Sequence, residues 1–175
     1  MPFADPHKNL MALGLQEGQT VADLGAGSGF YTLEAARMVG SGHVYAVDVQ
    51  ADLLARIKNA AYEQHLGNVE VLHGDMERVG GTRIREESID VALVSNVLFQ
   101  IENKEDFVKE VARILKSGGR VLVADWSESF GGLGPVPEQV VTENTARGLF
   151  KQHGFAEVTV IDAGDHHYGI IFRKD

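Results

Sequence analysis

The chain has 175 residues, of which 44% are hydrophobic and 23% charged. This length and composition predict one soluble globular domain over residues 1–175. The chain has no cysteine, which excludes disulfides and thiolate metal sites. The formal net charge of −9 provides no positive field for a phosphate backbone, so nucleic acid and anionic membranes are disfavoured as partners. No apolar run approaches the roughly 20 residues that span a bilayer, and the N-terminus does not resemble a signal peptide, so we expect no membrane insertion and a cytoplasmic location.

Strand-like apolar runs alternate with helical periodicity, which is typical of an α/β fold with a mainly parallel sheet. The first five predicted strands cover residues 20–24, 43–47, 69–73, 89–94 and 120–124. Apolar residues at helical spacing predict helices over residues 30–39 and 53–65 and a third one around residues 107–115, with residues 116–119 as its stop. Few apolar residues lie between residues 76 and 88, so we expect a short crossover helix there or none.

The last part of the chain predicts a loop, a helix and a hairpin. Residues 129–137 contain three glycines and two prolines, which is typical of a loop. A helix is expected from about residue 138 to 153, and residues 155–161 and 167–172 are close enough to pair as a hairpin with its turn at 163–165. At the other end, we expect residues 1–14 to form an arm or lid ahead of a core that begins at residue 15.

Three alternating glycines, Gly25, Gly27 and Gly29, follow the first predicted strand directly. Glycine tolerates positive φ and lets the backbone pass close to a ligand, and the helix that follows offers unpaired N–H groups to an anionic group. A dinucleotide-binding turn reads G-x-G-x-x-G. Here the third glycine comes one residue early and Phe30 stands in its place, so the spacing disfavours a nicotinamide dinucleotide.

Asp23 precedes this turn by two residues, and Asp48 ends the second predicted strand, where a carboxylate can accept both hydroxyl hydrogens of a ribose. This arrangement resembles class I S-adenosylmethionine-dependent methyltransferases. The resemblance covers about residues 15–174, and the segments LHGDM, SIDVALVSNVL, LKSGGRV and HGF support it in the expected order. It implies a single-domain Rossmann-like three-layer sandwich, with a seven-stranded, mostly parallel sheet of order 3-2-1-4-5-7-6 and an antiparallel C-terminal strand.

The resemblance also implies S-adenosyl-L-methionine as the cofactor, S-adenosyl-L-homocysteine as its product, and a set of residues that bind it. The glycine turn would lie against the methionine moiety, Asp48 would hold the ribose, and residues 74–76 would contact the edge and face of the adenine. The implied cofactor-binding residues are Asp23, Gly25, Ala26, Gly27, Tyr31, Asp48, Val49, Gly74, Asp75, Met76, Ser95 and Asn96.

Four of these residues also have purely structural interpretations. Met76 is suited to filling an irregular gap in the core, and Asp75 is suited to capping the following turn. Asp48 can be the N-cap of the next helix while it also binds a ligand. Tyr31 lies at helical spacing, where an aromatic residue most often packs in the core.

The acceptor side is less defined, and the sequence identifies no catalytic base. The acceptor-side candidates are His7, Asn96, Phe99, Trp126 and Glu128. A base is needed for an oxygen or carbon acceptor and is dispensable for a neutral amine or a thiolate. A lone Trp or His is more often structural. The adjacent His166 and His167 point to opposite faces of a strand, so we expect no metal site.

Two sequence features narrow the acceptor to a small molecule. Residues 95–98 read Ser-Asn-Val-Leu, unlike the Asn/Asp-Pro-Pro-Tyr of amino-methyltransferases that act on nucleic-acid bases and glutamine. The cysteines with which arsenite methyltransferases bind arsenic are absent, whereas the fourth and fifth strands suggest quinone and other small-molecule methyltransferases. The short arm leaves the pocket open in a monomer or completed by a second subunit in a homodimer. A catalytically inactive cofactor-binding module and an NAD-dependent oxidoreductase remain as alternatives.

Overall fold

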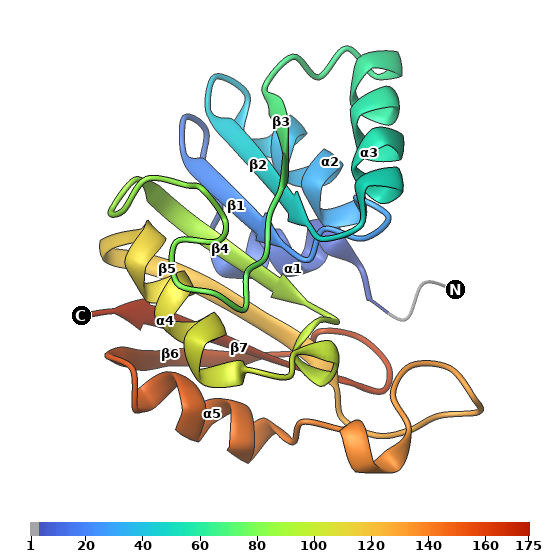
Figure 1. Cartoon of the computed structure of the whole chain (residues 1–175), viewed down its shortest axis with the longest axis vertical. Coiled ribbons are helices and arrows are strands. Elements are labelled where there is room, and N and C mark those ends of the chain that lie inside the picture. The colour runs from blue at the N-terminus through green and yellow to red at the C-terminus, as the bar shows by residue number, and fades with distance from the viewer. Residues whose placement is uncertain (1–3) are drawn as a thin grey trace.

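The structure, a computed structural model, describes residues 4–175 and contains one sheet with helices on both of its faces (Figure 1). The strands are β1 (Thr20–Leu24), β2 (His43–Asp48), β3 (Val69–His73), β4 (Ile89–Ser95), β5 (Leu115–Trp126), β6 (Phe155–Ile161) and β7 (His167–Lys174). The helices are α1 (Pro6–Leu13), α2 (Phe30–Val39), α3 (Ala51–Glu63), α4 (Lys104–Ile114) and α5 (Glu143–Lys151), with short 3₁₀ helices η1 (Leu98–Gln100) and η2 (Pro137–Gln139).

The seven strands follow the order β3-β2-β1-β4-β5-β7-β6, which confirms the predicted topology. Strands β1 to β5 pair in parallel, whereas β7 is antiparallel to both β5 and β6. β1 lies between β2 and β4, since its Ala22 is opposite Tyr45 of β2 and Ala92 of β4. The chain therefore extends the sheet first on one side of β1 and then on the other, and open α/β sheets bind ligands at the carboxyl ends of strands beside such a reversal.

Both faces of the sheet are covered by helices, which explains the nearly continuous apolar runs in the central strands. On one face, Phe150 of α5 stacks on Phe172 of β7 with ring centroids 5.0 Å apart. On the other face, Leu10 and Leu13 of α1 are fully buried together with Val39 of α2. The two packed layers hold the central strands rigidly beneath the site described below.

The N-terminal segment differs from the predicted arm, because most of its described part is helical and packed. Asp5 is the N-cap of α1 and accepts a hydrogen bond from the amide of Lys8 at 3.2 Å. Leu10 and Leu13 anchor this helix in the core, because both side chains are fully buried. Residues 1–3 of the expected lid lie outside the described residues.

The predicted helix over residues 138–153 is split in two. Residues 140–142 separate η2 from α5, and α5 begins only at Glu143, where the hydroxyl of Thr142 accepts a hydrogen bond from the amide of Thr145 at 3.2 Å. The helix stop predicted at residues 116–119 was also wrong. α4 already ends at Ile114, and residues 116–119 belong to β5. As expected, the described residues between β3 and β4 contain no α-helix.

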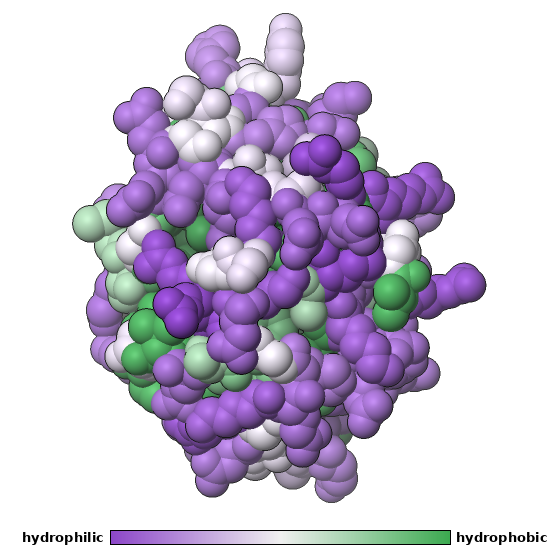
Figure 2. Space-filling model, turned by 90° about the vertical axis from the view of Figure 1, so that its left-hand side faces the viewer, coloured by the Kyte–Doolittle hydropathy of each residue, from purple (hydrophilic) through white to green (hydrophobic). Residues whose placement is uncertain are grey.

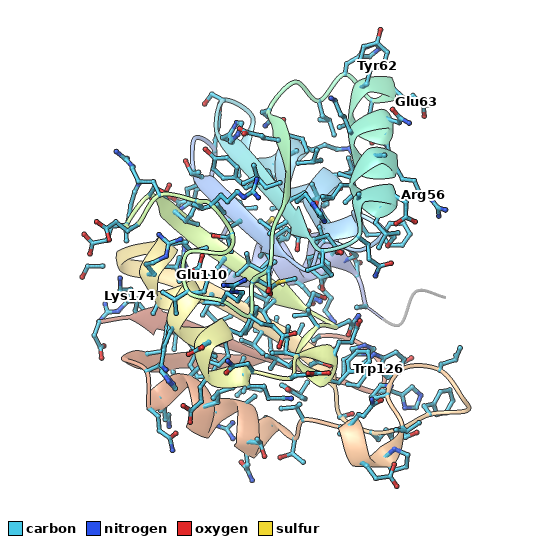
Figure 3. The ribbon with its side chains drawn as sticks, in the orientation of Figure 1. Arg56, Tyr62, Glu63, Glu110, Trp126 and Lys174 are labelled. Atoms are coloured by element: carbon cyan, nitrogen blue, oxygen red, sulfur yellow. The ribbon has the colours of Figure 1, made fainter. Side chains whose placement is uncertain are left out.

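The surface at the amino ends of the parallel strands is mostly hydrophilic. Figure 2 views the molecule from this side and shows hydrophobic side chains only in separate small groups. The outer side of α3 is equally polar, with Arg56 and Glu63 pointing away from the sheet (Figure 3). Among residues 4–175, we find no helix with the length and apolar character required to cross a membrane.

Candidate active site

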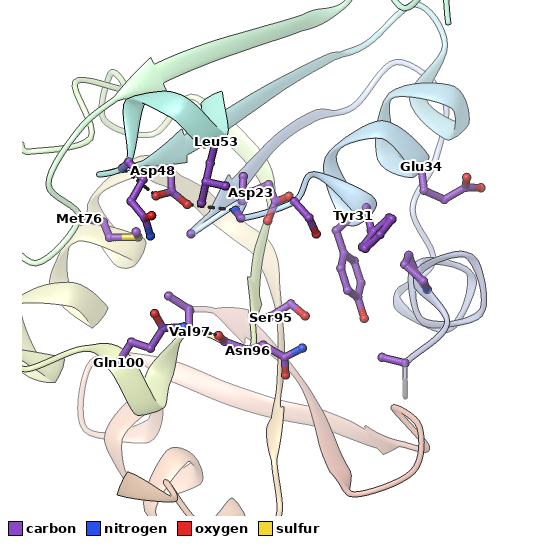
Figure 4. Close-up of a pocket in the computed structure, with 18 of the residues that line it drawn as sticks. Asp23, Tyr31, Glu34, Asp48, Leu53, Met76, Ser95, Asn96, Val97 and Gln100 are labelled. Atoms are coloured by element: carbon purple, nitrogen blue, oxygen red, sulfur yellow. Dashed lines mark hydrogen bonds between the residues drawn. The ribbon is translucent and has the colours of Figure 1, made fainter. Parts of the chain in front are cut away.

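A cavity of about 830 Å³ opens at the carboxyl ends of β1 and β4. Figure 4 shows Asp48 and Met76 at one end of this cavity and Tyr31 at the other, with Asn96 across from them. The predicted residues that line it are His7, Asp23, Gly25, Ala26, Gly27, Tyr31, Asp48, Val49, Asp75, Met76, Ser95, Asn96 and Trp126. Three predicted residues do not line this cavity. Gly74 lines a smaller neighbouring depression, Phe99 is half-buried elsewhere, and Glu128 is exposed.

The glycine turn needs glycine for both its backbone and its surroundings. Gly25 and Gly27 have φ of +78° and +54°, in the left-handed region. A Cβ on Gly25 would come within 2.6 Å of a methyl group of Val97, which packs directly against this glycine. A Cβ on Gly27 would touch only the carbonyl oxygen of Gly25, at 3.8 Å, so the space beside Gly27 is open to a ligand.

Asp48 ties this turn to the end of β2. Its carboxylate accepts hydrogen bonds from the amide of Gly27 at 3.0 Å and from the amide of Gln50 at 2.9 Å. The N-cap of α3 is Gln50, so Asp48 supports the turn before the helix and is not its cap. A carboxylate offers about four lone-pair sites. About two of them are therefore available to hydrogen-bond donors of a ligand.

Asp23 is a buried acid beneath the turn, only 3% exposed. Burial raises its pKa to about 6; the negative charge of Asp48 adds to this shift, and a hydrogen bond from the hydroxyl of Thr32 at 2.6 Å opposes it. A cationic group nearby would favour the ionised carboxylate. Thr32 was not among the predicted residues, although its place in the first turn of α2 allows its side chain to face β1.

At the β3 end, the structural interpretations of Asp75 and Met76 hold alongside their places on the cavity wall. Asp75 accepts a hydrogen bond from the amide of Glu77 at 3.0 Å and so caps a turn. Met76 is 4% exposed and belongs to the main core cluster. Val49, in contrast, is 53% exposed, so it is an apolar wall that a flat ring can cover.

Tyr31 joins three parts of the molecule at the opposite end. Its hydroxyl accepts a hydrogen bond at 2.7 Å from the side-chain amide of Asn9 in α1, which also donates to the carbonyl of Ala163 at 3.1 Å. Burial raises the pKa of Tyr31, with hydrogen bonds to Asn9 and Ser95 acting against it. The phenol is therefore neutral at physiological pH, and it fixes α1 beside the cavity.

Asn96 has two costly features. Its φ of +54° is uncommon for a residue other than glycine, and its side-chain oxygen is buried without a hydrogen-bond partner among residues 4–175. The loop is held by Asp125, whose carboxylate accepts from the amides of Leu98 and Trp126, each at 2.8 Å. Burial raises the pKa of Asp125 to about 6, opposed by these bonds. Strained, unsatisfied residues on a cavity wall are typical of binding sites.

Aromatic and imidazole rings border the cavity where β5 ends. The rings of Trp126 and His167 have centroids 4.4 Å apart at 40°, and Trp126 lies beside the loop that follows β5 (Figure 3). His7 is bound through Nδ1 to Glu34 of α2 at 2.7 Å. Glu128 is bound to His166 at the same distance. Across residues 4–175, no group of three or more His, Asp or Glu side chains is placed to hold a metal ion.

The strand order β3-β2-β1-β4-β5-β7-β6 is that of the Rossmann-like fold of class I methyltransferases. A family model described as a methyltransferase domain matches residues 15–168. The chain therefore belongs to the methyltransferase-domain family.

Several known proteins resemble the chain. An arsenite methyltransferase of Halobacterium salinarum is 31% identical over 124 residues, which cover 70% of this chain and 30% of that protein. A ubiquinone/menaquinone biosynthesis C-methyltransferase of Azotobacter vinelandii is 30% identical over 122 residues, covering 69% and 47%. The chain thus spans less than half the length of either curated relative. The crystal structure of an S-adenosylmethionine-dependent methyltransferase from Aquifex aeolicus superposes with a TM-score of 0.89 at 28% identity, covering 99% of this chain and 91% of that one.

Proposed function

We propose that this chain is an enzyme that transfers a methyl group from S-adenosylmethionine to a small-molecule acceptor. The observation that carries the proposal is the hydrogen bond at 3.0 Å from the amide of Gly27 to Asp48. It joins the turn suited to the methionine moiety to the acid suited to the ribose, within one cavity that also reaches Asn96 and Trp126.

The charges of the cavity fit this cofactor. Asp23, Asp48 and Asp75 all lie on its walls, and acids favour a ligand that carries an ammonium and a sulfonium group. The open space beside Gly27 accepts a ligand without steric conflict. When bound, the cofactor supplies an electrophilic methyl carbon. The protein contributes binding, alignment and exclusion of water.

The acceptor side supports a small molecule. Trp126 and Asn96 line the same cavity as the residues suited to the cofactor. The named relatives are an arsenite methyltransferase and a ubiquinone/menaquinone biosynthesis C-methyltransferase. The absence of cysteine from the 175 residues removes the thiolates that would bind arsenic. An organic acceptor, such as a ring compound, is therefore favoured over arsenite.

The rest of the proposal concerns the protein as a whole. We infer a single methyltransferase domain over residues 1–175, in which the segment before residue 15 covers part of the cavity through Pro6 and His7. We also infer a monomer or a homodimer located in the cytoplasm. The acidic net charge supports a partner that is neither nucleic acid nor an anionic membrane.

Incubation with methyl-labelled S-adenosylmethionine and a panel of small organic acceptors tests the activity. We expect label in at least one acceptor, in an amount that grows with time and enzyme concentration. Binding of S-adenosylhomocysteine without transfer to any acceptor would instead favour an inactive cofactor-binding module. Reduction or oxidation of an acceptor with a nicotinamide cofactor would favour the oxidoreductase alternative.

A further inference from the structure

His167, at the first position of β7, lines the cavity beside the end of β5. Its Nδ1 lies 2.7 Å from the backbone carbonyl oxygen of Asp165. Because a carbonyl oxygen can only accept a hydrogen bond, Nδ1 carries the proton and Nε2 carries a free lone pair. The backbone of the preceding turn therefore fixes both the tautomer and the orientation of the ring.

The other nitrogen of this ring is unsatisfied. Nε2 of His167 is buried and has no hydrogen-bond partner among residues 4–175. Buried polar atoms in native proteins nearly always have a partner, so an exception requires an explanation such as a catalytic role. Burial also lowers the pKa of His167, with the positive charge of His166 adding to the shift and the bond to Asp165 opposing it. The imidazole is therefore neutral at physiological pH.

Other acid–base groups near this end of the cavity are already engaged. His7 is bound to Glu34, and Glu128 is bound to His166. The carboxylate of Asp125 accepts backbone hydrogen bonds that shape the loop after β4. Of these proton acceptors, His167 is the one whose accepting atom has no partner within the described chain.

We propose that His167 is the general base of the methyl transfer, and that the acceptor carries a hydroxyl group of phenol or enol type. This inference rests on the methyltransferase function proposed above. A phenol or enol is far more acidic than an aliphatic alcohol, so a neutral imidazole can take the proton of the former but not of the latter. A neutral amine or a thiolate needs no base. The indole of Trp126 provides a flat surface for a ring that bears this hydroxyl.

The proton and the electrons balance in one displacement. The acceptor O–H bond breaks and its proton moves to Nε2 of His167, which becomes an imidazolium. The oxygen electron pair forms the new bond to the methyl carbon, and the electrons of the broken S–C bond stay on sulfur. The imidazolium then returns its proton to water.

Entry of the acceptor requires a local movement, because Nε2 is covered in this structure. The indole of Trp126 lies against the imidazole, and the loop after β5 lies against the indole, since a Cβ on Gly134 would come within 2.5 Å of it. We expect this loop and the indole to shift together when the acceptor binds.

Nuclear magnetic resonance of the full chain with ¹⁵N-labelled histidine tests the base without relying on turnover. With S-adenosylhomocysteine added at pH about 7.5, we expect His167 to show a protonated Nδ1 and an unprotonated Nε2, assigned by comparison with the His167→Asn variant. A protonated Nε2 would overturn the proposal, whatever the activity of the enzyme.

Turnover tests the base and the acceptor class together. The probes are phenol, catechol and guaiacol, whose hydroxyl groups are protonated at neutral pH, with benzylamine and thiophenol as the alternative arm. We expect label on a hydroxyl oxygen and a loss of about 10²-fold or more in kcat for His167→Asn, with partial rescue of His167→Gly by added imidazole. The matched control, His166→Asn, should retain kcat within about twofold.

The outcomes distinguish this proposal from the one it rests on. Label on an amine or thiol alone, or a His167→Asn variant with nearly full kcat, would overturn the role of His167 and leave the methyltransferase function intact. Failure of the wild type to bind S-adenosylhomocysteine would contradict both proposals, whereas binding with no label on any probe would overturn the acceptor class proposed here. Affinity of His167→Asn for S-adenosylhomocysteine within about twofold of wild type would show that the variant is folded.

Discussion

At the scale of single residues, Asp48 both shapes the site and is placed to bind the ligand. It holds the amide of Gly27 at 3.0 Å and is 5% exposed. Asp48→Ala should weaken S-adenosylhomocysteine binding by at least about tenfold in calorimetry, because the ribose hydroxyls lose their acceptors and the turn loses its tie. Asp52→Ala, an exposed acid on the first turn of α3, is the matched control and should change nothing. Equal affinities for the two variants would contradict the role of Asp48.

Asp23 predicts a pH dependence of cofactor binding. Its pKa in the free protein is raised to about 6, chiefly by burial. A bound ammonium group stabilises the ionised carboxylate, so binding releases a proton below this pKa. Affinity for S-adenosylhomocysteine should be constant above about pH 7 and should fall by up to about tenfold per pH unit below about pH 6. Asp23→Asn should bind more weakly and lose this slope, whereas a slope that persists in the variant would assign it to another group.

The sequence predicted some of these residues and missed others for a physical reason. The local sequence pattern predicts Asp23 and Asp48 as site residues, because each lies at or near the end of an apolar run. The carboxyl ends of parallel strands meet at one edge of the sheet, so the two acids are expected to lie close together. His167 depends on long-range register, since it lies opposite Trp126 only once β7 has paired with β5. Its hydrogen bond to Asp165 then decides which nitrogen carries the proton, and no spacing in the sequence encodes that choice.

At the scale of elements, the turn between β1 and α2 combines strained backbone with close packing. Gly25→Ala adds both a left-handed φ penalty and a contact of 2.6 Å with Val97. Gly154→Ala is the matched control, because its φ is +83° and a Cβ there would meet nothing within 4 Å. In chemical denaturation we expect a loss of about 1 kcal/mol for the control and about 1–3 kcal/mol more for Gly25→Ala. Equal losses would show that Val97 yields to the added methyl group.

Element boundaries were predictable where a pattern was long or had clear start and stop signals. The bounds of β1, β3 and α2 agree with their predictions residue for residue. α1 has only eight residues, too few for a periodic pattern to stand out, and its burial comes from tertiary packing of Leu10 and Leu13. The split before α5 reflects the N-cap hydroxyl of Thr142, which a count of apolar residues does not weigh.

At the scale of the whole molecule, the sheet order decides where the cavity lies. The reversal beside β1 places the ends of β1, β2 and β4 around one opening. Alternation of strands and helices predicts the parallel sheet, and the resemblance to a known family supplied the exact order. The cavity volume and the covering by α1 required the packed structure.

Two buried acids predict a global effect of pH on stability. Burial raises the pKa values of Asp23 and Asp125 to about 6 in the folded protein, from the ordinary aspartate value of 3.8. The folded state therefore binds these protons more tightly than the unfolded state, and their contribution to the free energy of unfolding falls as pH rises from about 4 to 6. Relative to wild type, Asp23→Asn should gain on the order of 2–3 kcal/mol between pH 4 and pH 7 in urea denaturation. A difference that does not vary with pH would contradict the raised pKa.

The central claim is that the cavity at the ends of β1 and β4 binds an S-adenosyl amino acid. Isothermal titration of the whole chain with S-adenosylhomocysteine, and separately with NAD, tests it most directly. We predict one site with a dissociation constant of about 100 µM or tighter for S-adenosylhomocysteine, and binding of NAD at least about tenfold weaker. Tighter binding of NAD, or no binding of S-adenosylhomocysteine by the folded protein, would contradict the account.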